Sequence, residues 1–559
     1  MECSLAIVGG GPCGLAVLSR LAREAEAPSS GRLAGSRARH ILQRTLVIDP
    51  SGWLSSWRCK LTSQGVSTLR SPTFVHPHPS RVSDEALREF AIRRGYPLTP
   101  IQGLQASRSE WTSCSPAAFD DFCSELLRGV KERLPLSTIP SRQHLTAAHV
   151  YRATVIDILP LPPSGGHAPL KLILSDGLPS IIAAHVVLAV SDGGAHLLPE
   201  WYAEARAAAP PRHSLLHASE LAGCHSLAPL HAERGREECE LKVQRHGAPS
   251  VQRLAHRCHR AARTAARLLL APASFFPFKS MEPLNLLERA LAGRAALSPV
   301  LAYLARKRSV PEAMRRSGGG RLIVFGGGLS AAQLAIHALS LGWRRVVLVS
   351  RAALVVRPFD LELCWIERHR LPALLPAEQE FFSSSCARRR ELLRHARPGG
   401  SVTPACMQEL RRLQTRGGLV VEENTTVTAA EWRRGEEAAA AAQSLETTRL
   451  LGVIPSSWTV SLVDSNGWER IAHADAIWMA TGSRLEVASQ PLLQSVRKLS
   501  PAPEHGGLPQ LTPALRWCES MPLYIAGAMS ALQVGPDALT LGGAAAAASR
   551  IVSDLLQIS

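Results

Sequence analysis

The chain lacks any paired cysteine motif. Its 12 cysteines are scattered over 559 residues, and no two of them form a Cys-x-x-Cys pair. A disulfide reductase needs such a pair for dithiol chemistry, and a small secreted scaffold needs a regular ladder of cysteines. The sequence therefore excludes both classes and predicts reduced thiols in a cytoplasmic setting.

Long apolar runs are also missing. No run reaches the roughly 18 apolar residues that a membrane span requires. The first strand begins within a few residues of Met1, so we expect no cleavable targeting peptide. Apolar residues make up 46% of the chain, which is typical of a globular protein, and its length predicts two to four domains.

Acidic residues are few relative to basic ones, and the net charge is +17. Much of the excess falls in an Ala/Arg-rich segment, residues 201–317. A basic segment can hold RNA or an acidic surface, but a solvated insertion is the favoured interpretation, and we do not expect a nucleic-acid partner. The histidines and cysteines within this segment match no zinc spacing, so no metal is predicted. They are Cys224, Cys239, His256, Cys258 and His259.

A glycine turn dominates the N-terminus. The apolar run at residues 5–8 predicts a buried strand, and the pattern Gly9-x-Gly11-x-x-Gly14 leads directly into a helix. Gly9 permits the tight turn, Gly11 lets a pyrophosphate approach the backbone, and Gly14 lets helix and strand pack closely. The first turn of the helix, with Pro12, then offers N–H groups to the phosphates.

Asp49 ends the next predicted strand, where a carboxylate can bind a ribose hydroxyl. It comes later in the chain than usual, which we attribute to a low-complexity insertion at residues 27–44.

A second glycine turn follows the strand at residues 322–325. Its pattern is Gly326-x-Gly328-x-x-Ala331, and Ser330 lies within its first helical turn. The next strand ends in Ser350 and Arg351 instead of a carboxylate. Because arginine and a hydroxyl can bind a 2′-phosphate that a carboxylate would repel, this turn is predicted to prefer NADPH over NADH.

Two such units in one chain predict two dinucleotides with chemistry between them: FAD on the first turn and NADPH on the second. The fold class is α/β, with two Rossmann-like domains and a helical or irregular insertion. The second domain is expected to be inserted in the first. We expect the first FAD part at 1–200, the insertion at 201–317, the NADPH domain at 318–473 and the second FAD part at 474–559.

The C-terminal part carries further candidate cofactor contacts. An apolar strand at residues 474–483, containing Gly482, is predicted to return the chain to the FAD domain. Gly527 ends a last strand of the FAD sheet. Gly535 and Pro536 are expected to begin the terminal helix, whose N-terminus can stabilise negative charge on a reduced flavin.

The loops after Asp49 supply candidates for groups near the flavin or substrate. Prolines keep this region out of helix, so Trp57, Arg70 and His76 are predicted to flank the cofactor. A core role for Trp57 and an ordinary loop role for His76 remain alternatives.

These motifs together resemble the two-dinucleotide-binding-domain flavoproteins near lysine and ornithine N-hydroxylases and flavin-containing monooxygenases. The resemblance rests on both glycine turns, on Arg70 with its flanking residues, and on Phe359-Asp360, Ala480-Thr-Gly482 and Gly527. It implies that NADPH reduces FAD. Oxygen is then captured as a flavin peroxide that oxygenates a small amine-like nucleophile.

Other functions remain open from the sequence. They are an NADPH oxidase or dehydrogenase that oxygenates no substrate, and a flavin-binding redox regulator. A homo-oligomer also remains open.

Overall fold

The computed structural model describes ten stretches of the chain: residues 2–26, 31–79, 85–133, 150–162, 168–190, 195–208, 214–221, 320–370, 375–433 and 457–558. The Cys/His group at 224–259 and nearly all of the basic insertion lie outside these stretches. Among the described helices, none is long and apolar enough to cross a bilayer.

An eight-stranded sheet forms the first domain, and its centre is parallel. β1 contains the apolar run that the sequence predicts as a strand, and it pairs in parallel with both β2 and β8. β7 pairs with β8 and with β6 as an antiparallel extension. The path of the sheet is β21 (Arg516–Cys518), β22 (Met521–Ile525), β8 (Ile181–Leu188), β1 (Glu2–Val8), β2 (Thr45–Ile48) and β5 (Val150–Tyr151), with β6 (Val155–Pro160) and β7 (Leu170–Leu174) off the path.

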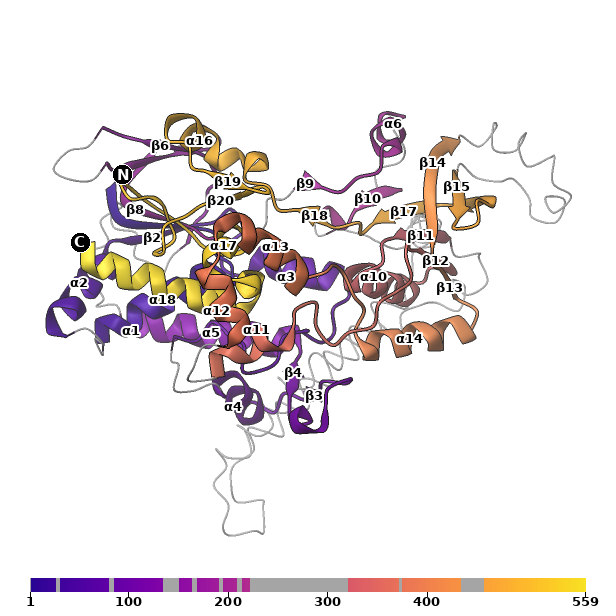
Figure 1. Cartoon of the computed structure of the whole chain (residues 1–559), viewed down its shortest axis with the longest axis horizontal. Coiled ribbons are helices and arrows are strands. Elements are labelled where there is room, and N and C mark those ends of the chain that lie inside the picture. Colours follow the sequence, from indigo (N-terminus) through magenta and orange to yellow (C-terminus); the bar gives the residue numbers. More distant parts are fainter. Residues whose placement is uncertain are drawn as a thin grey trace, which may run out of the picture.

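Four helices pack beside this sheet, and one of them contacts each of the other three. α1 (Pro12–Glu26) contacts α18 (Leu541–Ile558), α5 (Pro116–Arg133) and α2 (Arg32–Gln43) (Figure 1). Most of the stretch expected as a low-complexity insertion is thus a helix, α2, whose Ala34, Ala38 and Ile41 are buried.

A five-stranded parallel sheet forms the second domain and lies beside the first along the long axis of the molecule (Figure 1). α10 (Leu329–Ser340) packs on it together with α14 (Pro404–Thr415). The strands run in the order β10 (Leu215–His217), β17 (Ala476–Met479), β11 (Arg321–Phe325), β12 (Arg345–Val349) and β13 (Leu419–Glu422). Beside it stands a smaller antiparallel sheet of β14 (Thr425–Arg433), β15 (Ser457–Asp464) and β16 (Glu469–Ala474).

The two domains are joined by a pair of short crossing strands. β9 (Ala195–His196) leaves the first domain, β18 (Ser483–Arg484) returns to it, and the two pair antiparallel. β10 and β17 lie outside the 318–473 range expected for the second domain, yet both belong to its sheet. We therefore propose that this domain runs from one crossing strand to the other.

One segment of the second domain packs on the first. Between β12 and β13 the chain forms α11 (Leu363–Glu367), α12 (Pro376–Ser383) and α13 (Cys386–Ala396). Their Trp365, Phe381 and Leu393 belong to the core of the first domain, not the second. This segment lies against α17 (Ala531–Val534) and the 3-10 turn η10 (Pro536–Leu539) (Figure 1).

Candidate functional site

A cavity of about 1900 Å³ lies between the two domains, and both glycine turns open into it. Gly9 and Gly11 line it from the first domain, Gly326 and Gly328 from the second. The carboxyl ends of the parallel strands β1 and β11 therefore face a shared space, which is where open α/β sheets bind nucleotides.

The first turn has the geometry that a dinucleotide pyrophosphate requires. Gly9 has φ +111°, and a Cβ on it would lie 2.5 Å from the Ala189 carbonyl oxygen. A Cβ on Gly14 would lie 2.2 Å from the Gly9 oxygen, so helix and strand meet as predicted. Around Gly11, by contrast, no atom of the described residues lies within 4 Å of the Cβ position. The backbone at Gly11 is thus open to a ligand, and these residues fit FAD.

Asp49 stands at the end of β2 and lines the cavity, with Pro12 opposite. Its Oδ2 accepts a hydrogen bond from the Gly10 N–H at 2.9 Å, and its Oδ1 accepts from the N–H groups of Ser51 and Gly52. Three N–H donors fix the carboxylate beside the glycine turn. Oδ2 keeps a further lone pair, so the ribose role predicted for Asp49 remains compatible with this geometry.

The C-terminal wall differs from the prediction. Gly527 (φ +81°) lines the cavity, as do residues 538–541. Gly535 and Pro536 do not contribute to this lining. Pro536 begins η10 instead, α18 begins only at Leu541, and a Cβ on Gly535 would lie 3.0 Å from the Trp365 ring. These two residues therefore face α11 and not the cavity.

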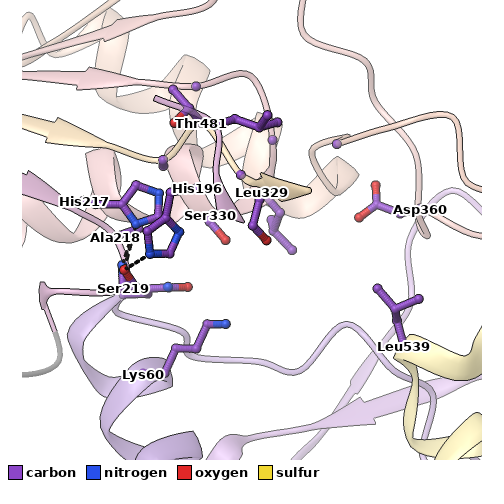
Figure 2. Close-up of a pocket in the computed structure, with 18 of the residues that line it drawn as sticks. Lys60, His196, His217, Ala218, Ser219, Leu329, Ser330, Asp360, Thr481 and Leu539 are labelled. Atoms are coloured by element: carbon purple, nitrogen blue, oxygen red, sulfur yellow. Dashed lines mark hydrogen bonds between the residues drawn. The ribbon is translucent and has the colours of Figure 1, made fainter. Parts of the chain in front are cut away.

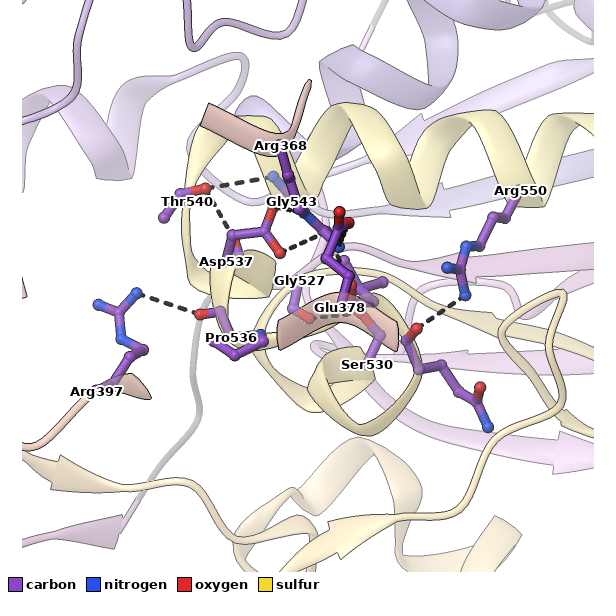
Figure 3. Close-up of polar contacts among 12 residues, drawn as sticks. Arg368, Glu378, Arg397, Gly527, Ser530, Pro536, Asp537, Thr540, Gly543 and Arg550 are labelled. Atoms are coloured by element: carbon purple, nitrogen blue, oxygen red, sulfur yellow. Dashed lines mark hydrogen bonds and ion pairs between the residues drawn. The ribbon is translucent and has the colours of Figure 1, made fainter. Parts of the chain in front are cut away.

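A cluster of arginines binds the residues that precede this part of the cavity lining (Figure 3). The buried Arg368 pairs with Asp537 at 2.6 Å and with Glu378 at 3.2 Å, and both carboxylates are buried. Neighbouring arginines bind successive backbone carbonyls. The bonds run from Arg389 to Leu532, from Arg550 to Gln533, from Arg368 to Val534 and from Arg397 to Pro536. Together they fix the path of the chain just before residues 538–541.

The second turn repeats the tight parts of the first. Gly326 has φ +141°, and its Cβ position lies 2.3 Å from the Ala480 oxygen. Ala331 is fully buried beside it, and Ser330 lines the cavity from the first turn of α10. Ser350 is buried and donates to the Ala352 oxygen at 2.6 Å, whereas Arg351 is exposed at the cavity. Arg351 is thus free to reach a 2′-phosphate, and these residues fit NADPH.

The second turn departs from the first at its middle glycine. The Cβ position of Gly328 lies 3.5 Å from the Gly400 Cα, and that of Gly400 lies 3.0 Å from the Gly328 Cα. A backbone loop therefore lies on the spot that is empty beside Gly11.

The three residues expected near flavin or substrate are dispersed. Trp57 lies on the helix α3 (Ser55–Ser63) and not on the loop expected there, because no proline falls between residues 51 and 71. It lines the cavity, with its ring 5.0 Å from that of Phe119. Arg70 also lines it, paired with Asp360 at 2.6 Å. His76 instead is buried, with its ring 5.7 Å from that of Phe122, and does not line the cavity. Gly482 (φ +85°) lines the cavity as expected.

A histidine–serine relay that the sequence analysis did not single out also lines the cavity (Figure 2). Ser219 Oγ lies 3.1 Å from His196 Nε2 and 2.8 Å from His217 Nδ1. Because the Ser219 N–H donates to His217 Nδ1, that nitrogen is an acceptor and Nε2 carries the hydrogen. The Ser219 hydroxyl then donates to His217 and accepts from His196.

His217 is neutral in this arrangement. Burial lowers its pKa to about 4, and His196 and Lys60 act in the same direction while Glu220 opposes them. Within the described residues, His217 Nε2 and the nearby Thr481 Oγ1 are buried without a hydrogen-bond partner. No sequence pattern marks these residues as part of a site. They lie on or next to β9, β10 and β17, which come from separate parts of the chain and meet only in the folded protein.

Across the cavity, Lys60 of α3 (Ser55–Ser63) and Leu539 face Ser330, Thr481 and the two histidines (Figure 2). Cys13 lines the same space, but burial raises its pKa to about 11, so it is a thiol at neutral pH. The cavity thus offers backbone N–H groups, cations and the neutral imidazole of His217, but no thiolate at Cys13.

Comparison with known proteins shows the fold. No family model and no curated protein sequence matches the chain significantly. Many solved structures match the chain. Among those that match over nearly all of it are L-lysine 6-monooxygenase from Pseudomonas syringae, with 15% identity, TM-score 0.54 and 99% of each chain covered, and the ornithine N-hydroxylase of Kutzneria sp. 744, with 14% identity, TM-score 0.55 and coverage of 100% of this chain and 99% of the other. The resemblance seen in the motifs is confirmed at the level of fold: the chain shares the two-domain α/β architecture of these monooxygenases.

Proposed function

We propose that this protein is an FAD-dependent oxidoreductase that uses NADPH, and that it is a monooxygenase acting on a small amine-like nucleophile. One observation carries the proposal: two glycine turns of dinucleotide-binding geometry open into one cavity. A cofactor on each turn would bring a nicotinamide and a flavin into the same water-restricted space.

The first domain would hold FAD. Gly9, Gly11 and Gly14 shape the turn, the N-terminus of α1 faces the pyrophosphate, and Asp49 binds a ribose hydroxyl. Gly527 and residues 538–541 would border the ring system. When bound, FAD supplies hydride acceptance and reaction with dioxygen.

The second domain would hold NADPH. Gly326, Ser330 and Arg351 all line the cavity, where the glycine turn would receive the pyrophosphate and the arginine the 2′-phosphate. In this arrangement Arg351 provides the charge that selects NADPH, and Ala331 provides the close packing of α10 on β11.

The substrate class rests on structural likeness and on the cavity. The Kutzneria structure carries reduced FAD, NADP⁺ and L-ornithine according to its description, and the Pseudomonas enzyme is described as acting on lysine. In this chain the neutral His217, at the end of the Ser219–His196 relay, adds no positive charge to that of Lys60 across the cavity.

Stoichiometry under air tests the proposal. Protein reconstituted with FAD is given NADPH, and consumption of NADPH and oxygen is followed together with release of hydrogen peroxide, in the presence and absence of amine candidates such as lysine and ornithine. We expect an amine to lower the peroxide formed per NADPH and to yield an oxygenated product. Peroxide equal to NADPH with every amine would identify an oxidase instead. No consumption of NADPH at all would refute the enzymatic proposal.

A further inference from the structure

The two glycine turns differ at the one glycine that a pyrophosphate must approach. The Cβ position of Gly11 has no atom within 4 Å, whereas that of Gly328 is 3.5 Å from the Gly400 backbone. In a dinucleotide turn, the middle glycine is kept free of a side chain so that the pyrophosphate can lie against the backbone. The Gly400 backbone therefore lies against the glycine that the pyrophosphate would have to approach on the second turn.

The loop that carries Gly400, residues 398–401, is anchored at its end by Ser401 and by the following Val402, which pairs with the chain at Val356. Ser401 is buried, its N–H and its hydroxyl both donate to Asp360 Oδ1, and its Oγ accepts from Arg70 at 2.7 Å. Gly399 has φ +124° and no atom within 4 Å of its Cβ position. The loop is thus fixed at Ser401 and follows a glycine backbone up to that point.

Arg70 supplies this anchor from the other domain. Its guanidinium donates to Asp360 Oδ2 at 2.6 Å and to the carbonyl oxygens of Arg357 and Pro358. Arg70 belongs to the first domain, where Leu69 next to it is held by the Cys114 carbonyl. A planar guanidinium can bind all of these acceptors at once, and a lysine ammonium cannot.

We propose that Arg70 is a positioning residue that seats the 398–401 loop on the second glycine turn, so that the loop must leave before the pyrophosphate of NADPH can bind there. The proposal rests on the proposed function, because it assigns NADPH to the second turn. Loosening the anchor shifts the loop off Gly328 and raises the fraction of molecules competent to bind, and the apparent affinity rises with that fraction.

Nucleotide binding by the full-length protein tests this. Arg70→Lys keeps the charge but loses the fork, and Ser401→Ala removes the hydroxyl between Arg70 and Asp360. Arg412→Lys, in an exposed pair with Glu409, serves as the matched control. Calorimetry measures the affinity for NADP⁺ and for 2′-AMP, which carries the 2′-phosphate but no pyrophosphate. Thermal unfolding and flavin content are recorded for each variant.

We expect Arg70→Lys and Ser401→Ala to bind NADP⁺ at least about tenfold more tightly than the wild type, with 2′-AMP affinity unchanged and the control unaltered. A simple loss of structure would weaken NADP⁺ binding, whereas release of the loop would strengthen it. The direction of the affinity change therefore separates these two explanations. NADP⁺ affinity that is unchanged or lower in both variants overturns the proposal, and so does an equal gain for 2′-AMP.

Failure of the proposed function gives a different pattern. Protein that never takes up FAD but gains NADP⁺ affinity on Arg70→Lys would support the loop proposal and contradict the flavoprotein assignment. Protein whose flavin is reduced by NADPH, but whose NADP⁺ affinity rises in neither variant, would support the flavoprotein assignment and contradict the loop proposal. If neither the wild type nor any variant binds NADP⁺, the loop proposal is overturned, because loosening the loop should expose the binding site.

Discussion

At the scale of single residues, the glycines of the first turn do different work although their spacing makes them look alike. Gly9 and Gly14 are required by neighbouring backbone, because a Cβ on either would meet a carbonyl oxygen. At Gly11, none of the described residues requires the absence of a side chain. A ligand against the backbone explains it, and this separates folding from binding in one motif.

Alanine substitutions should reveal that separation. Gly11→Ala should change the free energy of unfolding by no more than about 1 kcal/mol and weaken FAD binding at least tenfold, about 1.4 kcal/mol. Gly9→Ala should lower stability by about 3 kcal/mol or more, because its φ of +111° and the Ala189 oxygen exclude a methyl group. Denaturant unfolding and flavin-fluorescence titration measure the two effects. Equal loss of stability in both variants would contradict this account.

His217 is expected to make the stability of the fold depend on pH in one defined window. Its folded pKa of about 4 lies below the ordinary 6.5, so between these values the unfolded chain binds more protons than the native state. The stability that His217 contributes is therefore present above pH 6.5 and is lost as the pH falls toward 4, by up to about 3 kcal/mol. His217→Asn should flatten the stability profile in that window. An unaltered slope in His217→Asn would refute the assignment.

At the scale of elements, the sequence does not predict that the segment α11–α13 packs on the first domain. The strands and helices next to each glycine turn are local patterns, and β1, α1, β11 and α10 form where the sequence predicts them. Gly535 and Pro536 were expected at the cofactor, but long-range bonds from arginines 368, 389, 397 and 550 draw the preceding carbonyls toward α11–α13. No local pattern reports such contacts, because their partners are more than 100 residues away or on another helix.

Arg368 should be the most sensitive member of this cluster. Arg368→Met leaves Asp537 and Glu378 buried without their cation, so we expect a loss of about 3–5 kcal/mol. Residues 538–541 should also lose their fixed path, so FAD retention should fall. Arg412→Met breaks an exposed pair and should cost no more than about 1 kcal/mol. Chemical unfolding and flavin content after gel filtration measure both; similar losses in the two variants would contradict the role of the cluster.

At the scale of the whole molecule, the paired crossing strands β9 and β18 explain how one cavity arises from two domains. The sequence predicts the two nucleotide units and their insertion order, and the fold agrees. It does not predict that β10 and β17 share the second sheet, since parallel pairing between strands some 260 residues apart leaves no local signal. The same pairing brings His217, Thr481 and His196 together at the cavity.

The central claim is that electrons pass between cofactors held on the two turns, and anaerobic reduction tests it most directly. FAD-loaded protein is mixed with NADPH in the absence of oxygen, and the visible flavin absorption is followed in a stopped-flow instrument. We predict that the absorption is bleached in the wild type and that Arg351→Ala requires far more NADPH for the same rate. A protein that stays colourless with added FAD, or a bound flavin that NADPH does not bleach, would contradict the account.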